Sequence, residues 1–257
     1  MDFLFGRLRR LNARIDALWG RLPESPNAQL PCSGADLVHR DRTVFLLAGT
    51  SARGACEVLE ERLARDGFLV RRLGVGGVGD LLRNRGVEEL AERLGREIGG
   101  DLARCGADRC AVIAVGAVGL AARYYVKRMG GDEECRLLVT LATPHKGAPP
   151  WLTRLPLRLL SRMRGQLVPG GPFLRRLCAG PFPSRSRIVS IYARNCRQYP
   201  FPLCCLDAEG KPNAVNREFW AESAGTALEL LGRADVYAAV RRELEAAFGG
   251  SGGAGEG

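Results

Sequence analysis

The feature that most constrains the fold is an alternation of short apolar runs and longer amphipathic stretches from Thr43 onward. The apolar runs have the length of strands, and the stretches between them have the period of helices. Strands that are apolar on both faces belong in a parallel sheet that helices cover on both sides. The alternation therefore predicts an α/β fold with a mainly parallel sheet.

The predicted elements occupy most of the chain. We expect strands at 43–48, 68–73, 110–115, 136–141 and 187–192, and helices at 54–65, 87–104, 119–129 and 233–248. In sheets of this kind, ligands bind beyond the carboxyl ends of the strands. The loops that follow the first, third, fourth and fifth strands are therefore expected to share one rim.

Three segments depart from this alternation and suggest how the chain is divided. Residues 1–40 are predicted to form an amphipathic N-terminal helix and a linker, followed by an α/β domain at 41–248. Within that domain, the Leu-, Arg- and Pro-rich stretch at about 148–184 is expected to form a helical cap over the rim. The Gly-rich residues 249–257 are expected to be a flexible tail.

The first 22 residues leave two interpretations open. Leucines and one isoleucine recur at steps of four and three, and arginines occupy the other faces. This basic amphipathic helix either docks on its own domain, or residues 1–22 bind an anionic membrane surface or a protein partner.

Charge and cysteine usage exclude several classes of protein. The net charge is +10, but it is dispersed and mostly arginine, and no nucleic-acid-binding motif accompanies it, so no nucleic acid partner is expected. The nine cysteines are odd in number, and Cys204 and Cys205 are adjacent, which does not indicate a secreted disulfide framework. Paired metal-ligand spacing is missing as well. We expect reduced thiols, no metal, no cofactor, and a cytoplasmic protein that is peripheral to the membrane if the first helix binds there.

Four segments resemble the lipase-like α/β-hydrolases. Phe45-Leu46-Leu47-Ala48-Gly49-Thr50 resembles their first strand and His-Gly loop, and residues 119–125 (GLAARYY) resemble the helix after their nucleophile. Residues 138–147 (LVTLATPHKG) are similar to their "TLGTPHxG" segment, and residues 169–174 (PGGPFL) to a cap element. Order and spacing match from about 43 to 248. The resemblance implies an α/β-hydrolase fold and, for an active member, hydrolysis of carboxylic esters.

The catalytic triad of this family has no counterpart at the matching positions. The family carries its serine in GxSxG, on a strained turn between strand and helix. An ungapped match puts Gly116 there, and a shift by one residue puts Ala117 there. The acid position falls on Cys196 and the histidine position on Ala227. Because loss of the nucleophile or the base of a serine hydrolase costs about 10⁶ in turnover, the resemblance implies a degenerate, inactive member.

Only two histidines occur in the chain, which limits any displaced catalytic machinery. His39 precedes the first strand, and His145 stands in the TPHxG position, where the family has a structural residue. An alternative is therefore an active esterase in which Cys196 and His145 form a displaced thiolate pair. A further alternative is a basic protein that associates with membrane surfaces.

The binding half of the site does not depend on a triad. The family holds its oxyanion with backbone amides, which correspond here to the loop Gly49-Thr50-Ser51 and to Ala117. An acyl chain would lie beneath the cap, against Trp151 and Leu155. The leading hypothesis is a degenerate lipase-like hydrolase that binds an apolar acyl ligand or a protein partner.

Overall fold

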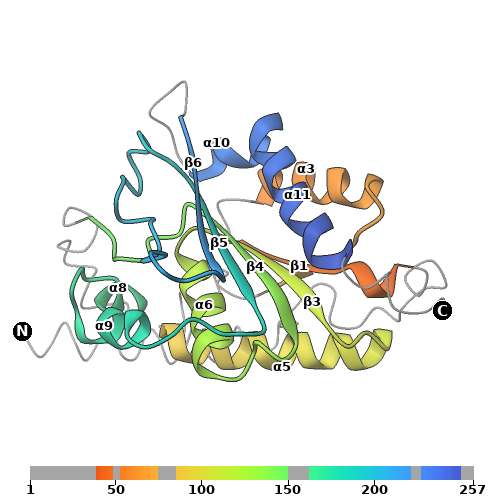
Figure 1. Cartoon of the computed structure of the whole chain (residues 1–257), viewed down its shortest axis with the longest axis horizontal. Coiled ribbons are helices and arrows are strands. Elements are labelled where there is room, and N and C mark those ends of the chain that lie inside the picture. Colours follow the sequence, from red (N-terminus) through yellow and green to blue (C-terminus); the bar gives the residue numbers. More distant parts are fainter. Residues whose placement is uncertain (1–38, 49–52, 75–84, 150–161, 221–226, 250–257) are drawn as a thin grey trace, which may run out of the picture.

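The protein is built on one sheet in which all neighbouring strands are parallel (Figure 1). The computed structural model describes residues 39–48, 53–74, 85–149, 162–220 and 227–249. The strands are β1 (Thr43–Ala48), β2 (Leu69–Leu73), β3 (Cys110–Val115), β4 (Cys135–Leu141), β5 (Arg187–Ala193) and β6 (Ala214–Phe219). Their order in the sheet is β2-β1-β3-β4-β5-β6.

Helices cover both faces of the sheet (Figure 1). One face carries α5 (Val87–Cys105) and α6 (Gly119–Arg128), and the other carries α3 (Arg53–Arg65), α10 (Ala227–Gly232) and α11 (Ala234–Gly249). Two short 3-10 helices, η1 (Arg40–Arg42) and η3 (Gly116–Val118), lie before β1 and after β3. The predicted α/β class with a parallel sheet is confirmed.

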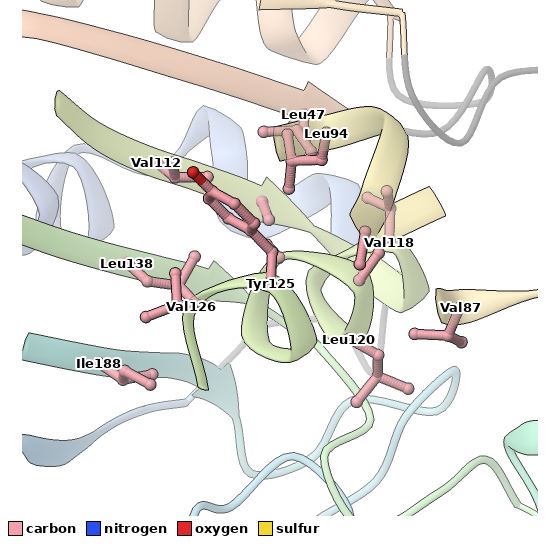
Figure 2. Packing of buried hydrophobic residues seen from close by; sticks show 14 of the residues in the cluster. Leu47, Val87, Leu94, Val112, Val118, Leu120, Tyr125, Val126, Leu138 and Ile188 are labelled. Carbon is pink, nitrogen blue, oxygen red and sulfur yellow. The ribbon is translucent and has the colours of Figure 1, made fainter. Parts of the chain in front are cut away.

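The central strands are apolar on both faces because each face packs against helices. In β3, the Val112 side chain joins the core under α5 and α6, whereas Ile113 joins the core under α3 and α11. Figure 2 shows the first of these cores, where Tyr125 and Val126 of α6 face Leu138 and Val112 of the sheet. Two cores separated by one sheet explain the continuous apolar runs in the sequence.

The structure confirms the five predicted strands and four predicted helices to within one or two residues. It adds β6, which the sequence did not indicate because Asn216, Arg217 and Glu218 interrupt any apolar run. As the edge strand of the sheet, β6 has only one neighbouring strand, and its middle is half-buried or exposed. The six-residue helix α10 was also missed, since so short a segment carries little periodicity.

Two helices lie inside the region predicted as a cap, namely α8 (Arg162–Gln166) and α9 (Pro172–Cys178). The Gln166 side chain accepts a hydrogen bond of 2.7 Å from the backbone N–H of Val87, at the start of α5. The remaining cap residues 150–161, the N-terminal segment 1–38 and the tail 250–257 lie outside the described residues. The proposed domain limits stay predictions.

Two further features of the structure are the hydropathy of its helices and the state of its cysteines. Among the described residues, none of the helices combines the length and the hydropathy needed to cross a bilayer. Seven of the eight cysteines in the described residues carry free thiols, and they include Cys196, Cys204 and Cys205, as expected. Cys105, at the end of α5, is disulfide-bonded.

Candidate functional site

The turn between β3 and α6 contains the residue that takes the serine position in the ungapped match. Gly116 follows β3 directly and has a φ of +70°, in the left-handed region. A Cβ atom placed on Gly116 would have no heavy atom of the described residues within 4 Å beyond its chain neighbours. The turn therefore has the backbone conformation of a strained strand-to-helix turn, and no described residue occupies the space where a side chain would begin.

The loop after β4 is tied to this turn. The Thr143 hydroxyl donates a hydrogen bond of 2.8 Å to the carbonyl oxygen of Gly116. On the other side of the turn, a Cβ atom on Gly119 would lie 2.1 Å from the Thr143 Oγ1 atom. Thr143 therefore fixes the turn through a hydrogen bond and leaves room only for glycine at the start of α6.

His145 lies in the same loop but is fully buried. Its Nε2 atom is 2.9 Å from the Thr140 hydroxyl of β4, and its Nδ1 atom is 3.5 Å from the Arg123 guanidinium of α6. Arginine can only donate, so Nδ1 is the acceptor and Nε2 carries the proton. The Thr140 hydroxyl in turn donates a hydrogen bond of 3.2 Å to the carbonyl oxygen of Val189. Both ring nitrogens are engaged in the interior.

The electrostatics of this pocket keep His145 neutral. Burial, and then the neighbouring positive charge of Arg123, lower the pKa of His145 well below its ordinary value. Burial also lowers the pKa of Arg123, although a guanidinium remains protonated at neutral pH. A general base must receive a proton from the reacting group, and a fully buried imidazole with both nitrogens occupied is poorly placed for that role.

Cys196 is not among the hydrogen-bond partners of the His145 ring, which are Arg123 and Thr140. Cys196 follows β5 and belongs to the buried cluster under α3 and α11. His145 instead contacts Arg123 of α6, on the opposite face of the sheet. The other histidine, His39, precedes β1 and therefore lies at the amino ends of the strands. The turn at Gly116 lies at their carboxyl ends.

The remaining predicted site residues are only partly covered by the structure. Ala117 lies in η3, directly after Gly116, and packs half-buried against the core under α6. Ala227 begins α10. The other predicted binding residues lie outside the described residues, namely Gly49, Thr50, Ser51, Trp151 and Leu155. Within the described part of the chain, no group of three or more His, Cys, Asp or Glu side chains suits a metal ion.

The sequence did not identify Arg123 and Thr140 as the partners of His145. The signal for Arg123 was its position, because a charged residue stands three residues after Leu120 and three before Val126 on an apolar helix face. Its side chain is 1% exposed, so this position indicated a buried guanidinium in need of acceptors.

Comparisons with known proteins show similarity in structure but not in sequence. No family model and no curated protein matches the chain. The mature lipase BlEst2 of Bacillus licheniformis is similar in structure, with a TM-score of 0.62 and 11% identity, over 79% of this chain and 91% of that one. The chain has the α/β-hydrolase fold.

Further solved structures with the α/β-hydrolase fold give the same result. Lipase B of Aspergillus fumigatus has a TM-score of 0.59 and 15% identity, over 81% of this chain but only 56% of the lipase. A 2-hydroxy-6-oxo-6-phenylhexa-2,4-dienoate hydrolase of Rhodococcus has a TM-score of 0.53 and 15% identity, over 80% and 90% of the two chains. Since these identities are low, the likeness concerns the fold and not the chemistry.

Proposed function

We propose that this chain is a catalytically degenerate lipase-like hydrolase that binds an apolar acyl ligand at the carboxyl ends of its strands. The observation that carries the proposal is the pair of Gly116 and His145. Gly116 holds the conformation of the strained turn without a side chain, and His145 has both ring nitrogens occupied inside the core. The sequence has no other histidine beyond His39.

The left-handed φ of Gly116 also favours one of the two sequence matches. In the ungapped match the residue at the strained turn is Gly116, and in the shifted match it is Ala117. Only Gly116 has a positive φ, which supports the ungapped match. In either match the position offers hydrogen or methyl, and neither can attack an acyl carbon.

Binding can persist without this chemistry because backbone amides, and not side chains, hold the oxyanion in such sites. The backbone N–H of Ala117 lies in η3, directly after Gly116 and before α6. Two of the structural neighbours are lipases, which favours an acyl ligand over a protein partner.

Ester turnover tests the loss of activity. We expect the purified protein and its Gly116→Ser variant to hydrolyse p-nitrophenyl butyrate no faster than buffer, because the restored hydroxyl still has no base. Neither protein should be labelled by a fluorophosphonate probe. Wild-type turnover at esterase rates would overturn the proposal, and its loss in Cys196→Ala would favour the displaced thiolate instead.

Acyl binding is tested separately with a fluorescent fatty acid, anthroyloxy-stearate. We expect saturable binding by the wild type that weakens at least tenfold in Ala117→Phe, where a large side chain enters the predicted site. Ala179→Phe, at an exposed residue after α9, is the matched control and should bind like the wild type. Equal binding by all three proteins would place the ligand elsewhere and contradict an acyl site at the turn.

A further inference from the structure

Three cationic side chains surround one aromatic ring where α6, the end of α9 and the 207–211 loop meet. The ring is that of Phe182, which is half-buried against the core. The Arg123 guanidinium lies 5.6 Å from its centroid, the Lys127 Nζ atom 5.0 Å, and the Lys211 Nζ atom 5.2 Å. We call these three side chains the Phe182 cation cluster.

The cluster has no paired negative charge. In the described part of the chain, no carboxylate forms an ion pair with any of its three members. Lys127 donates to the carbonyl oxygens of Cys178, at 3.2 Å, and Gly180, at 3.4 Å. Lys211 donates to the carbonyl oxygen of Asp207, at 2.8 Å.

Arg123 is the least satisfied member of the cluster. Its terminal nitrogens contact the neutral His145 ring and, at 3.8 Å, the Cys178 sulfur. Its Nε atom is buried and has no hydrogen-bond partner. The Asp207 carboxylate acts on Arg123 from beyond ion-pair distance, and its own ion pair, at 2.8 Å, is with the Lys146 Nζ atom.

Another buried charge in the protein shows what a balanced site looks like. On the opposite face of the sheet, the buried Glu243 carboxylate pairs with Arg187 at 2.9 Å and with Arg217 at 2.7 Å. Two cations there form direct ion pairs with one anion. In the described part of the chain, the Phe182 cation cluster has no such pair, and the Asp207 carboxylate acts on Arg123 and Lys211 only from beyond ion-pair distance. A contact with an aromatic ring stabilises a cation but does not neutralise its charge.

The imbalance has a measurable effect on Lys127. Burial first, and then the positive charges of Arg123, Arg128 and Lys211, together lower the pKa of Lys127 to about 8. Lys127 and Lys211 are only partly buried, whereas Arg123 is buried. An anion at the cluster would therefore contact the two ammonium groups and would act on the charge of Arg123 from a short distance.

We propose that the Phe182 cation cluster binds a phosphate-class anion, either free phosphate or a phosphomonoester headgroup. A tetrahedral dianion presents several acceptor oxygens in different directions, which suits separate ammonium donors better than a planar carboxylate does. The guanidinium fork that a carboxylate prefers is already directed at His145 and Cys178. This inference is independent of the proposed loss of ester hydrolysis.

Titration with sodium phosphate tests the site directly. At constant ionic strength, phosphate should raise the midpoint of thermal unfolding, and sodium chloride should not. We expect Lys127→Met to weaken phosphate binding at least tenfold. Arg65→Met is the charge-matched control, because Arg65 is exposed on α3 and paired with Glu61, and it should bind phosphate like the wild type.

A second readout follows Lys127 itself in the wild-type protein. The chain has only three lysines, Lys127, Lys146 and Lys211, so ¹³C-methylated lysines give few signals to assign. Phosphate should raise the pKa of Lys127 and shift the signals of Lys127 and Lys211 more than the signal of Lys146. Lys127→Arg, which keeps the charge, should retain most of the binding.

Two results would overturn the proposal. One is a response to phosphate no larger than that to chloride at equal ionic strength, and the other is equal phosphate affinity in Lys127→Met and the wild type. Vesicles that contain phosphatidic acid separate the two sources of the ligand. Vesicle binding that free phosphate displaces identifies a lipid headgroup, and phosphate binding without vesicle binding identifies a soluble anion.

Discussion

The carboxyl ends of β3 and β4 are neighbours in the sheet, but they are built in opposite ways. At the end of β3, Gly116 has a φ of +70° and free space at its missing Cβ. At the end of β4, Ala142 has a φ of +48° although it is not glycine, and it is fully buried. The first end is relaxed and open, whereas the second is strained and packed.

The resemblance to lipase-like hydrolases makes this contrast informative. Those proteins have serine at the position matched by Gly116 and glycine at the position matched by Ala142, in TLGTPHxG. This chain therefore lacks a side chain at Gly116, where ester hydrolysis requires a nucleophile. It has a methyl group at Ala142, where the left-handed backbone favours glycine. A left-handed conformation costs a residue with a Cβ atom about 1–2 kcal/mol. The strained residue, Ala142, carries no reactive group. This supports the interpretation that Ala142 serves packing and not chemistry.

The largest expected effect tests how tightly the β4 loop is packed. In Gly147→Ala, the new Cβ atom would lie 2.7 Å from the carbonyl oxygen of Leu167 and 2.8 Å from the Cα atom of Pro169. Both contacts are with backbone, which cannot move cheaply, and φ is +109°. We expect the free energy of unfolding, measured in urea, to fall by about 3 kcal/mol.

Gly130→Ala is the matched control for this loop. Gly130 has a φ of +76° but no atom within 4 Å of an added Cβ, so it reports the cost of the backbone conformation alone. We expect a loss of about 1 kcal/mol. Equal losses in the two variants would mean that the β4 loop is no more tightly packed than an open turn.

The buried imidazole gives the next largest effect, and it depends on pH. Because the pKa of His145 is lower in the folded than in the unfolded protein, the unfolded state binds the extra proton as pH falls below about 6.5. His145 therefore lowers stability toward acid, by up to about 1.4 kcal/mol per pH unit. We expect His145→Gln to cost about 2 kcal/mol at pH 7.5 and to flatten this slope.

Urea unfolding at several pH values between 5 and 7.5 measures the slope. His39→Gln is the control, because His39 is exposed and should leave the slope as it is in the wild type. An unchanged slope in His145→Gln would show that the ring is not held neutral by burial and by Arg123.

Most of the fold followed from the sequence because the two apolar faces of the strands leave few alternatives. The runs at β1, β3, β4 and β5 are continuous, and they were predicted with nearly their observed bounds. β6 was missed because an edge strand is half-solvated and has Asn, Arg and Glu in its middle. Its pairing with β5 depends on the path of the chain between the two strands, and a local sequence pattern does not show that path.

The candidate site was predictable only in part. The turn at Gly116 follows from its match to the hydrolase motif, but the choice between Gly116 and Ala117 depends on a dihedral angle that composition does not reveal. His145 contacts Arg123, which is 22 residues away in sequence. Contacts between different elements, such as those that gather cations around Phe182, cannot be derived from periodicity.

The openness of the β3 end is tested by Gly116→Ala. Since none of the described residues beyond the chain neighbours lies within 4 Å of the added Cβ, the loss should come from the left-handed φ alone and amount to about 1 kcal/mol. It should therefore match Gly130→Ala in urea unfolding to within about 0.5 kcal/mol. A much larger loss would show that the turn is packed and would remove the contrast with β4.

The smallest effect has the opposite sign and concerns the strained end of β4. Ala142→Gly relieves the left-handed strain but also gives the unfolded chain more conformational freedom, so the two contributions partly cancel. We expect a net gain of about 0.5 kcal/mol in the free energy of unfolding. Ala122→Gly, within α6, is the control and should lose about 1 kcal/mol, because helical Ala122 has no strain to relieve. If both variants lost stability equally, Ala142 would not be strained, and the two strand ends would differ only in packing.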